Sequence, residues 1–436
     1  MVPERRTVLA SLAGLCSLGV AGCSAFDVTS ETATETAGLP SRSTPTSAAQ
    51  TTPESPTTTL TPEESDTSTA TTPDFVADAG DSRYFGGSVG IAGDTAVVGA
   101  RGTGSDAGGV AYVFVRSNGS WRKQATLAPD TDDASFARLP VAVSGHNVLV
   151  GHHLYARADG SWIRERTLVP DVDVSLEIRE ISIAVDDDTA VVGNPNHGSE
   201  GRAYVFHRSG ESWSHRVTLG SPDGEWGAGF GSAVSIDGDT LVVGSPSDET
   251  SNETNAGSAH VFTRQRGTWD EQATLTVDDG GDGLFFRSLS LSGDTVLVGT
   301  DGDEDPGDDR SGSAYVFERT DGDWRQRVRV VPTVESRDSW LGHYGDEVAL
   351  AGDVALLSGA WSPTPQIQDG VESVHLFSRD GDSWSQTRTL VPENEDAGDK
   401  LGPVALTGDA ALVGAPMERR NDDSEGRGVA YVYRLR

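Results

Sequence analysis

Short runs of alternating apolar and polar residues recur along the chain from Phe85 to its end, separated by turn-forming residues. Runs with a period of two are typical of half-buried β-strands rather than helices. In the clearest copy, Gly238-Asp239 joins the first two strands and a turn near Gly267 joins the last two, residue types that accept tight hairpins. The four strands are predicted over residues 234–236, 240–244, 258–264 and 269–275.

This four-strand pattern occurs seven times. The second strand ends on glycine in six copies and on serine in one, at intervals of 42 to 59 residues: Gly99, Gly151, Gly193, Gly244, Gly299, Ser358 and Gly414. A repeat of this size indicates units that bury their apolar faces against one another. Seven four-stranded units without a helical pattern predict an all-β fold, a seven-bladed β-propeller with antiparallel blades.

The seventh copy stops after its third strand at Arg434, without the tryptophan-containing fourth strand of the other six. Those six tryptophans are interpreted as blade packing: Trp121, Trp162, Trp213, Trp269, Trp324 and Trp384. The segment before the first copy resembles the end of a fourth strand. We therefore predict that residues 74–76 complete the seventh blade and close the ring, which removes two open sheet edges. The propeller is expected to span residues 74–436.

The phrases FGSAV at Phe230 and VVGSP at Val242 resemble FG-GAP repeats, which form the blades of integrin α-chain propellers and of secreted microbial proteins. The phrases GSAHVF and GTW are similar to the variant in haloarchaeal surface lipoproteins. This resemblance covers residues 85–436 and implies the fold more strongly than any function. Integrin-type repeats carry a calcium loop between the two phrases. Here that position holds a short Gly-Asp turn, so the calcium sites of the family are not transferred.

The first residues predict export. Arg5-Arg6 precede an apolar run too short for a membrane-spanning helix, and they resemble a twin-arginine signal. Val20-Ala21-Gly22-Cys23 resembles a lipobox, which makes residues 1–22 a signal peptide and Cys23 the lipid-modified residue. Residues 23–73, rich in Thr, Ser and Pro, are expected to be a disordered stalk. The expected location is the outer face of the cell membrane.

Acidic residues outnumber basic ones by 67 to 33, and the formal charge is −34. Only Lys123 and Lys400 are lysines. Such a charge is self-repelling in dilute buffer but is screened in molar salt. The composition favours a salt-loving host, with a merely acidic surface as the alternative. The sequence shows no basic stripe to contact phosphates, so nucleic acid is not expected as a partner.

Strand alternation places the long connections on one end of the ring, here called the loop face, and the short hairpins on the other, the hairpin face. The connections between second and third strands are long in six copies: residues 101–109, 194–201, 245–257, 300–312, 360–371 and 415–428. Three tryptophans outside the repeated strands fall on the loop face: Trp226, Trp340 and Trp361. His343 and Tyr344 lie near Trp340 in the sequence. Exposed aromatic rings favour contact with a ligand or partner. The alternative is that these rings fasten their own loops.

Asp301, Asp303, Asp305 and Asp309 have a spacing that can hold Ca²⁺, although Pro306 replaces the usual glycine and no distant glutamate follows. A solvated acidic loop is the alternative, and no other cofactor is expected. Asn118 and Asn252 begin sequons for N-glycosylation. Ser88 lies in a G-x-S-x-G pattern, but hydrolases place that serine between a strand and a helix, which this chain lacks.

Three functions remain open at this stage. The first is a lipid-anchored binding or adhesion module for an extracellular protein or glycan, which is not an enzyme. The second is an extracellular enzyme that acts on polysaccharide, which requires an acid and a base that converge on the loop face. The third is a structural surface protein without a specific ligand.

Overall fold

The computed structural model describes residues within the compact unit Ser55–Arg436. The described ranges are 58–59, 70–71, 75–77, 83–101, 108–129, 139–172, 174, 176, 181–221, 227–248, 257–277, 286–300, 313–332, 343–360, 374–391, 401–416 and 428–435. These residues form strands and turns. In these ranges no helix is long and apolar enough to cross a membrane.

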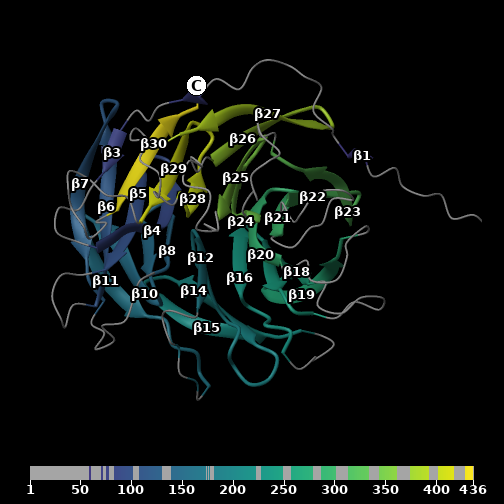
Figure 1. Ribbon diagram of the computed structural model, residues 1–436. Coiled ribbons are helices and arrows are strands. Elements are labelled where there is room, and N and C mark those ends of the chain that lie inside the picture. The colour runs from purple at the N-terminus through teal and green to yellow at the C-terminus, as the bar shows by residue number, and fades with distance from the viewer. Residues whose placement is uncertain are drawn as a thin grey trace, which may run out of the picture. The chain divides into compact units, whose positions relative to one another are not determined.

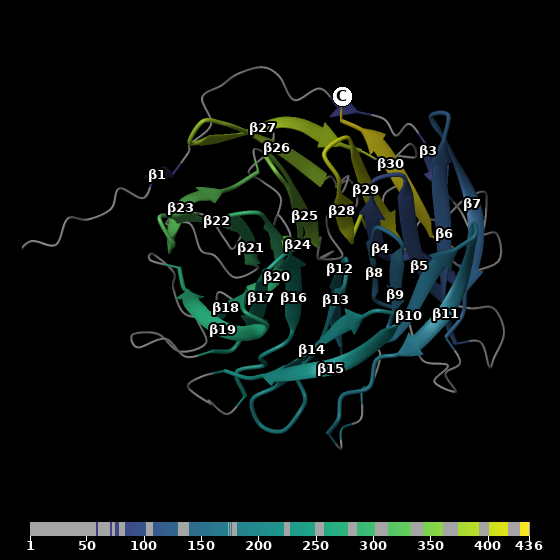
Figure 2. The same ribbon diagram turned by 180° about the vertical axis from the view of Figure 1, so that it is seen from behind.

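The sheets follow one another in a ring, as Figures 1 and 2 show from opposite sides. In blades 1 to 6 the first strand of the sequence lies nearest the centre and the fourth lies at the outer margin. Blade 1 contains β4 (Arg83–Ala92), β5 (Thr95–Arg101), β6 (Gly109–Ser117) and β7 (Ser120–Leu127). Blade 2 contains β8 (Val141–Ser144), β9 (Asn147–Val150), β10 (His153–Ala158) and β11 (Ser161–Thr167). Blade 3 contains β12 (Ser182–Asp186), β13 (Thr189–Asn194), β14 (Arg202–Ser209) and β15 (Ser212–Leu219).

The next three blades repeat this order. Blade 4 contains β16 (Ala233–Asp237), β17 (Thr240–Ser245), β18 (Ser258–Gln265) and β19 (Thr268–Leu275). Blade 5 contains β20 (Phe286–Ser292), β21 (Thr295–Thr300), β22 (Ser313–Thr320) and β23 (Asp323–Val330). Blade 6 contains β24 (His343–Ala351), β25 (Val354–Ala360), β26 (Val374–Asp380) and β27 (Ser383–Leu390). The predicted strands of blade 4 are confirmed, each within one residue at either end.

Blade 7 joins the two ends of the propeller. It contains β28 (Val404–Leu406), β29 (Ala410–Ala415), β30 (Val429–Arg434) and β3 (Phe75–Ala77). Strand β3 runs antiparallel to β30, with Phe75 opposite Val432 and Ala77 opposite Ala430. The predicted closure of the ring is confirmed, one residue further along the chain than expected.

Two further short strands lie in the stretch that was expected to be a disordered stalk. β1 (Thr58–Thr59) pairs in parallel with β23 of blade 5, and β2 (Ala70–Thr71) pairs in parallel with β27 of blade 6. These four residues are therefore bonded to the propeller, and they differ in this from the expected tether. β1, β2 and β3 thus pair with blades 5, 6 and 7 in that order, before the chain enters blade 1.

The apolar core is divided into seven layers, one between each pair of neighbouring blades. The second strands supply the most deeply buried residues, because each lies inside its blade and between two layers. In β17, for example, all six residues are buried. Burial of a valine or leucine side chain stabilises a fold by about 1.5–3 kcal/mol. The ring is thus stabilised by packing between blades rather than by a single central core.

The glycine that ends the second strand is required by a close approach between blades. A Cβ on Gly414 of blade 7 would overlap the carbonyl oxygen of Gly86 of blade 1. A Cβ on Gly193 of blade 3 would overlap the carbonyl oxygen of Gly231 of blade 4. Gly86 and Gly231 follow the phenylalanine of the FG phrase and have φ values of 93° and 94°, which favour glycine. The FG phrase of one blade therefore packs on the final glycine of the preceding blade.

Candidate functional site

On the loop face, every residue of the blade 3 connection between the second and third strands is described, residues 194–201. The backbone N–H of Gly227 donates to the carbonyl oxygen of Ser199 at 2.6 Å, and the N–H of Phe230 donates to that of Glu200 at 2.8 Å. Arg202 Nη1 also donates to Glu200 Oε2 at 2.6 Å. The two backbone bonds fix the loop of blade 3 to the chain that enters blade 4, and the Arg202–Glu200 bond fixes the loop to its own blade.

Two aromatic side chains of blade 3, Tyr204 and His215, pack beneath the same loop. The hydroxyl of Tyr204 contacts Nδ1 of His197, which belongs to the loop, and the ring of His215 lies 6.1 Å from that of Tyr204. Burial raises the pKa of Tyr204 to about 12, so its hydroxyl keeps its proton at neutral pH. The cluster holds the loop through hydrogen bonds and offers no reactive anion.

Most of the predicted site residues lie outside the described residues: Trp226, Trp340, Trp361, Asp301, Asp303, Asp305, Asp309, Cys23 and Asn252. The backbone of His343 and Tyr344 is described in β24, where the two residues pair with Ala360 and Gly359 of β25. The predicted aromatic contact site, the calcium loop and the lipidation site therefore remain predictions. Within the described residues, no group of three or more His, Cys, Asp or Glu side chains could hold a metal ion.

A buried ionisable cluster lies under the loop-face end of blade 4. His260 on β18 is 1% exposed, and its Nδ1 lies 3.0 Å from Oε1 of Glu271 on β19. Its Nε2 lies 3.0 Å from Oγ of Ser258 and 3.4 Å from Oδ2 of Asp248. Burial alone would lower the pKa of His260, but the hydrogen bonds to Asp248 and Glu271 outweigh it and raise the pKa.

Blade 6 carries a histidine at the equivalent place, with a glutamine where blade 4 has Glu271. His375 on β26 is 2% exposed, and its Nδ1 lies 3.1 Å from Nε2 of Gln386, which occupies the position of Glu271. Burial lowers the pKa of His375 to about 4. The same repeat position therefore holds a histidine that favours its proton in blade 4 and one that is neutral in blade 6.

The contacts in blade 4 resemble the serine–histidine–acid order of hydrolases, but they do not form such a site. The hydroxyl of Ser258 donates to Asp248 Oδ2 at 2.5 Å, and Ser258 is 1% exposed. A nucleophile must reach its substrate and pass its proton to the histidine, and Ser258 does neither in this arrangement. Ser88 of the G-x-S-x-G pattern is also buried, and its hydroxyl donates to the carbonyl oxygen of Leu139. Both serines therefore have structural roles.

The hairpin face carries a recurring contact between aspartate, arginine and tryptophan. The arginine lies near the end of the third strand, binds the aspartate of the first hairpin and stacks on the tryptophan of the fourth strand. In blade 5, Arg319 Nε donates to Asp294 Oδ1 at 2.7 Å, and its guanidinium carbon lies 5.2 Å from the centre of the Trp324 ring. Equivalent ion pairs are Arg116–Asp94, Arg208–Asp188, Arg264–Asp239 and Arg379–Asp353.

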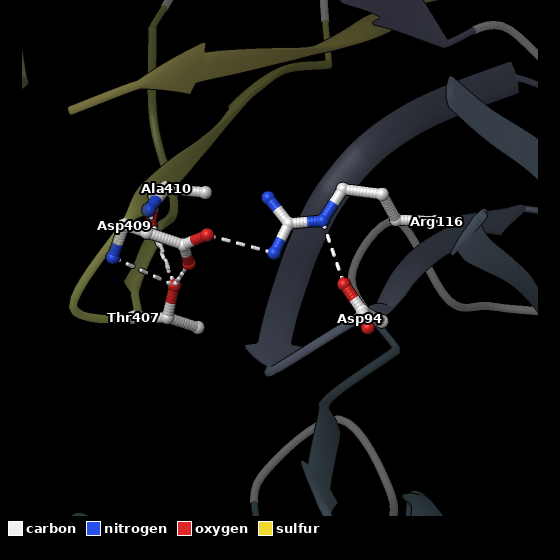
Figure 3. Close-up of polar contacts among 5 residues, drawn as sticks. All are labelled: Asp94, Arg116, Thr407, Asp409 and Ala410. Atoms are coloured by element: carbon white, nitrogen blue, oxygen red, sulfur yellow. Dashed lines mark hydrogen bonds and ion pairs between the residues drawn. The ribbon is translucent and has the colours of Figure 1, made fainter. Parts of the chain in front are cut away.

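The arginine of blade 1 forms a contact that differs from the others, because it joins the two ends of the ring. Arg116 Nε donates to Asp94 Oδ1 at 2.7 Å, and its Nη2 donates to Asp409 Oδ2 of blade 7 at 2.8 Å (Figure 3). Hydrogen bonds to Asp94 and then Asp409 raise the pKa of Arg116, against the opposing effect of burial. In blade 4, Arg264 instead reaches the hydroxyl of Thr189 in the preceding blade at 3.0 Å. Ala410 occupies that threonine position in blade 7, and the carboxylate of Asp409 takes over the contact.

Two hollows adjoin this contact. A cavity of about 570 Å³ is lined by Asp94, Arg116, Ser117, Asn118, Gly119 and Arg434. A second cavity of about 350 Å³ shares three of these residues and is lined by Arg116, Gly119, Ser120, Trp121, Ala410, Val432 and Arg434. Asn118 is exposed in the hairpin, with a φ of 51°. The first predicted glycosylation site therefore lies on the hairpin face beside the junction of blades 1 and 7.

Sequence reasoning interpreted the Gly-Asp turns as turn chemistry alone and missed their ion pairs. The partner arginine had a visible signal, because it follows a phenylalanine by two residues in five copies: Arg116, Arg208, Arg264, Arg319 and Arg379. The interpretation of the repeated tryptophans as packing is confirmed for Trp121, Trp213 and Trp384, which are 8%, 1% and 3% exposed. The guanidinium groups of Arg116 and Arg208 lie over the rings of Trp121 and Trp213.

Comparisons with known proteins agree with this geometry. The FG-GAP repeat model matches residues 76–114, 213–262, 269–317 and 384–433. The sheet order makes the molecule a seven-bladed β-propeller, and FG-GAP repeats are found at the matched residues, which include no strand of blade 2.

Two solved structures are similar to parts of the chain. One is a candidate 6-phosphogluconolactonase from Bacteroides uniformis, with 13% identity and a TM-score of 0.45, over 70% of this chain and 85% of that chain. The other is a protein from Lactobacillus plantarum, with 15% identity and a TM-score of 0.45, over 71% of this chain and 86% of that chain. No curated protein matches the sequence. Similarity at this level carries no information on activity.

Proposed function

We propose that this chain is a binding module that is displayed by a lipid anchor on the outer face of the cell membrane, where its loop face contacts an extracellular protein or a glycan. The observation that supports this proposal is the one-sided distribution of connections around a closed ring. The described hairpins between first and second strands and between third and fourth strands are short and share one face. All the longer connections leave from the other face.

The packing described above explains why this face suits recognition. Seven apolar layers make the ring a rigid base, and rigid scaffolds commonly present binding residues on their loops. The loop of blade 3 shows how such a connection is held, through the bonds of Ser199 and Glu200 to the next blade. Trp226, Trp340 and Trp361 are the side chains that we propose for the contact, because aromatic rings offer a large apolar area at a small entropic cost.

Binding to an array of glycans and extracellular proteins in molar salt tests the proposal. We expect a ligand whose binding falls in Trp340→Ala and Trp361→Ala variants but not in Glu211→Gln, a control in an exposed turn of the hairpin face. Loss of binding on chelation would support calcium at Asp301, Asp303, Asp305 and Asp309. Hydrolysis of a bound polysaccharide would favour an enzyme instead. An array without any ligand would refute the binding role and leave a structural protein.

The anchor is tested separately from the ligand. We propose that Cys23 carries the lipid and that a twin-arginine signal exports the chain, as the motifs at Arg5-Arg6 and Cys23 indicate. A Cys23→Ser variant is expected to appear in the growth medium while wild type stays with the membrane fraction. Retention of the variant in the membrane would contradict lipid attachment at this residue.

A further inference from the structure

The outer strands of blades 1, 2 and 3 reverse the charge balance of the chain. β7, β11 and β15 carry five cations and one carboxylate, whereas the whole chain has twice as many acidic as basic residues. The five cations are Arg122, Lys123, Arg164, Arg166 and Arg216, and all are exposed. The corresponding strand of blade 4, β19, carries Asp270 and Glu271 and no cation. The basic region therefore ends at blade 4.

The arginines of this region differ from those of the hairpin face in their partners. Each hairpin-face arginine described above is paired with an aspartate. Arg122, Arg166 and Arg216 form no ion pair with any residue in the described part of the chain, although acidic residues are abundant. Their charge is presented outward, in contrast to the arginines of the recurring hairpin-face contact.

Exposed apolar side chains accompany these charges. The large hydrophobic residues with the highest exposure in the described ranges are Ile163, Val169 and Val172, at 57%, 52% and 42%. All three lie within ten residues of one another, on β11 and the segment that follows it. Isolated exposed apolar residues need no explanation, but a group of them beside unpaired arginines is typical of an interaction surface.

Hydrogen bonds connect the three strands into one surface. Trp162 Nε1 of β11 donates to Gln124 Oε1 of β7 at 2.9 Å, and Gln124 Nε2 donates to the carbonyl oxygen of Gly160 at 3.3 Å. On the other side, the backbone N–H of Asp171 donates to His215 Nδ1 of β15 at 3.4 Å. Figures 1 and 2 show β7, β11 and β15 in succession along the outer margin.

We propose that this surface, the basic rim formed by Arg122, Ile163, Arg166, Val169 and Arg216, is a docking site for an acidic protein partner. Because the rim is positively charged, a complementary partner surface is negatively charged. Arginine is enriched and lysine is depleted in protein interfaces, and a polymer of charged sugars would leave Ile163 and Val169 without apolar contacts. Molar salt weakens the attraction of the charges at a distance, but it leaves apolar contacts intact.

The basic rim lies on the outer margin rather than on the loop face, so this inference is independent of the function proposed above. A peptide of alternating glutamate and leucine serves as the probe, and binding is measured by fluorescence anisotropy to the full-length protein. Salt is set to the lowest concentration at which the circular dichroism of the protein is unchanged. We expect Arg122→Glu/Arg216→Glu to raise Kd about tenfold and Ile163→Asn to raise it about threefold.

Blade 5 supplies a matched control with the same change of net charge. Arg325 and Arg327 occupy the same strand positions as Arg122 and Arg216, but they lie 3.8 Å from Asp323 and 3.3 Å from Glu318. The Arg325→Glu/Arg327→Glu variant is expected to bind the peptide as wild type does. An equal loss in both double variants would overturn the proposal, because net charge alone would then explain binding. Circular dichroism of each variant shows that it is folded.

Other occupants give different results in the same assay. Preferential binding of polyglucuronate, or of vesicles that contain phosphatidylglycerol, would overturn the proposal in favour of a polysaccharide or a membrane. Self-association that Arg122→Glu/Arg216→Glu abolishes, measured by sedimentation, would show that the occupant is a second copy. The Arg122→Glu/Arg216→Glu variant is also expected to bind the loop-face ligand as wild type does. A failure of the basic-rim proposal can then be distinguished from a failure of the loop-face proposal.

Discussion

A single substitution, Glu271→Gln, should weaken the stabilisation that the charged histidine of blade 4 provides, because it replaces one of the two carboxylates around His260 by the amide that blade 6 carries. His260 lies between Glu271 and Asp248, whereas His375 has Gln386 in place of the glutamate. Because the pKa of His260 is raised above its ordinary value of 6.5, the protonated ring stabilises the folded state. This contribution is complete below pH 6.5 and is lost as the pH rises through the raised pKa of the folded protein.

The size of the effect follows from the contact that is removed. A hydrogen bond to a charged group contributes about 1.5–3 kcal/mol. Since the side chain of Glu271 is 24% exposed and that of His260 is 1% exposed, a loss of about 2 kcal/mol is expected on the acidic side of the raised pKa. For a cooperative unit the size of Ser55–Arg436, this corresponds to a fall in Tm of about 2–3 °C.

Differential scanning calorimetry of wild type and Glu271→Gln in molar salt, from below pH 6.5 to well above it, tests this reasoning. The two Tm values should differ most at the acidic end and converge as the pH rises. A difference that stays constant with pH would refute the role of charge, because packing alone would then account for the change. In the converse control, Gln386→Glu should raise the pKa of His375 from about 4, which NMR of the imidazole protons measures directly.

Four further outcomes are expected. Burial holds the pKa of His375 at about 4, so stability is lost as the pH falls from 6.5 towards 4; His375→Gln should remove up to about 3 kcal/mol of this loss in urea titrations at the two ends of the range. Arg116→Met, which breaks contacts with two carboxylates, should cost about 1–2 kcal/mol and more than Arg319→Met, and equal urea midpoints would contradict the special role of the ring junction. Replacement of Phe75–Ala77 by Gly-Ser-Gly should cost roughly 3 kcal/mol or more and promote aggregation through the exposed edge of blade 7, as thermal unfolding and light scattering would show. Transfer from molar to about 0.1 M salt should unfold the protein by self-repulsion, and unchanged circular dichroism would contradict the salt-loving interpretation.

The fold could be predicted from the sequence because each copy repeats the same local signals. Glycine and aspartate mark the first hairpin of a copy, as at Gly238-Asp239, and period-two runs mark its strands. β1 and β2 could not be predicted in this way. They lie in Ser, Thr and Pro-rich sequence and are held by backbone pairing to β23 and β27, which leaves no apolar period to detect.

The candidate sites were predicted less completely, for reasons of register and distance. The contact of His260 with Glu271 was not visible, because a bulge in β19 places Thr274 opposite His260 and Glu271 opposite Phe262. The contact of Arg116 with Asp409 joins residues that are 293 positions apart, and only ring closure brings them together. The basic rim is recognised by arginines that form no ion pair in the described part of the chain. A count of charges along the sequence does not show which cations are paired.

The path of the N-terminal segment has a mechanical consequence. Residues 58–59, 70–71 and 75–77 contact blades 5, 6 and 7 in that order. A pull applied from the N-terminal side of Thr58 would reach the pairing with blade 5 first and the closing strand last. Such a force would thus break the pairings of β1 and β2, which are not part of the ring, before it could remove β3 and open the ring. Single-molecule force spectroscopy would register them as small early steps that precede the main rupture.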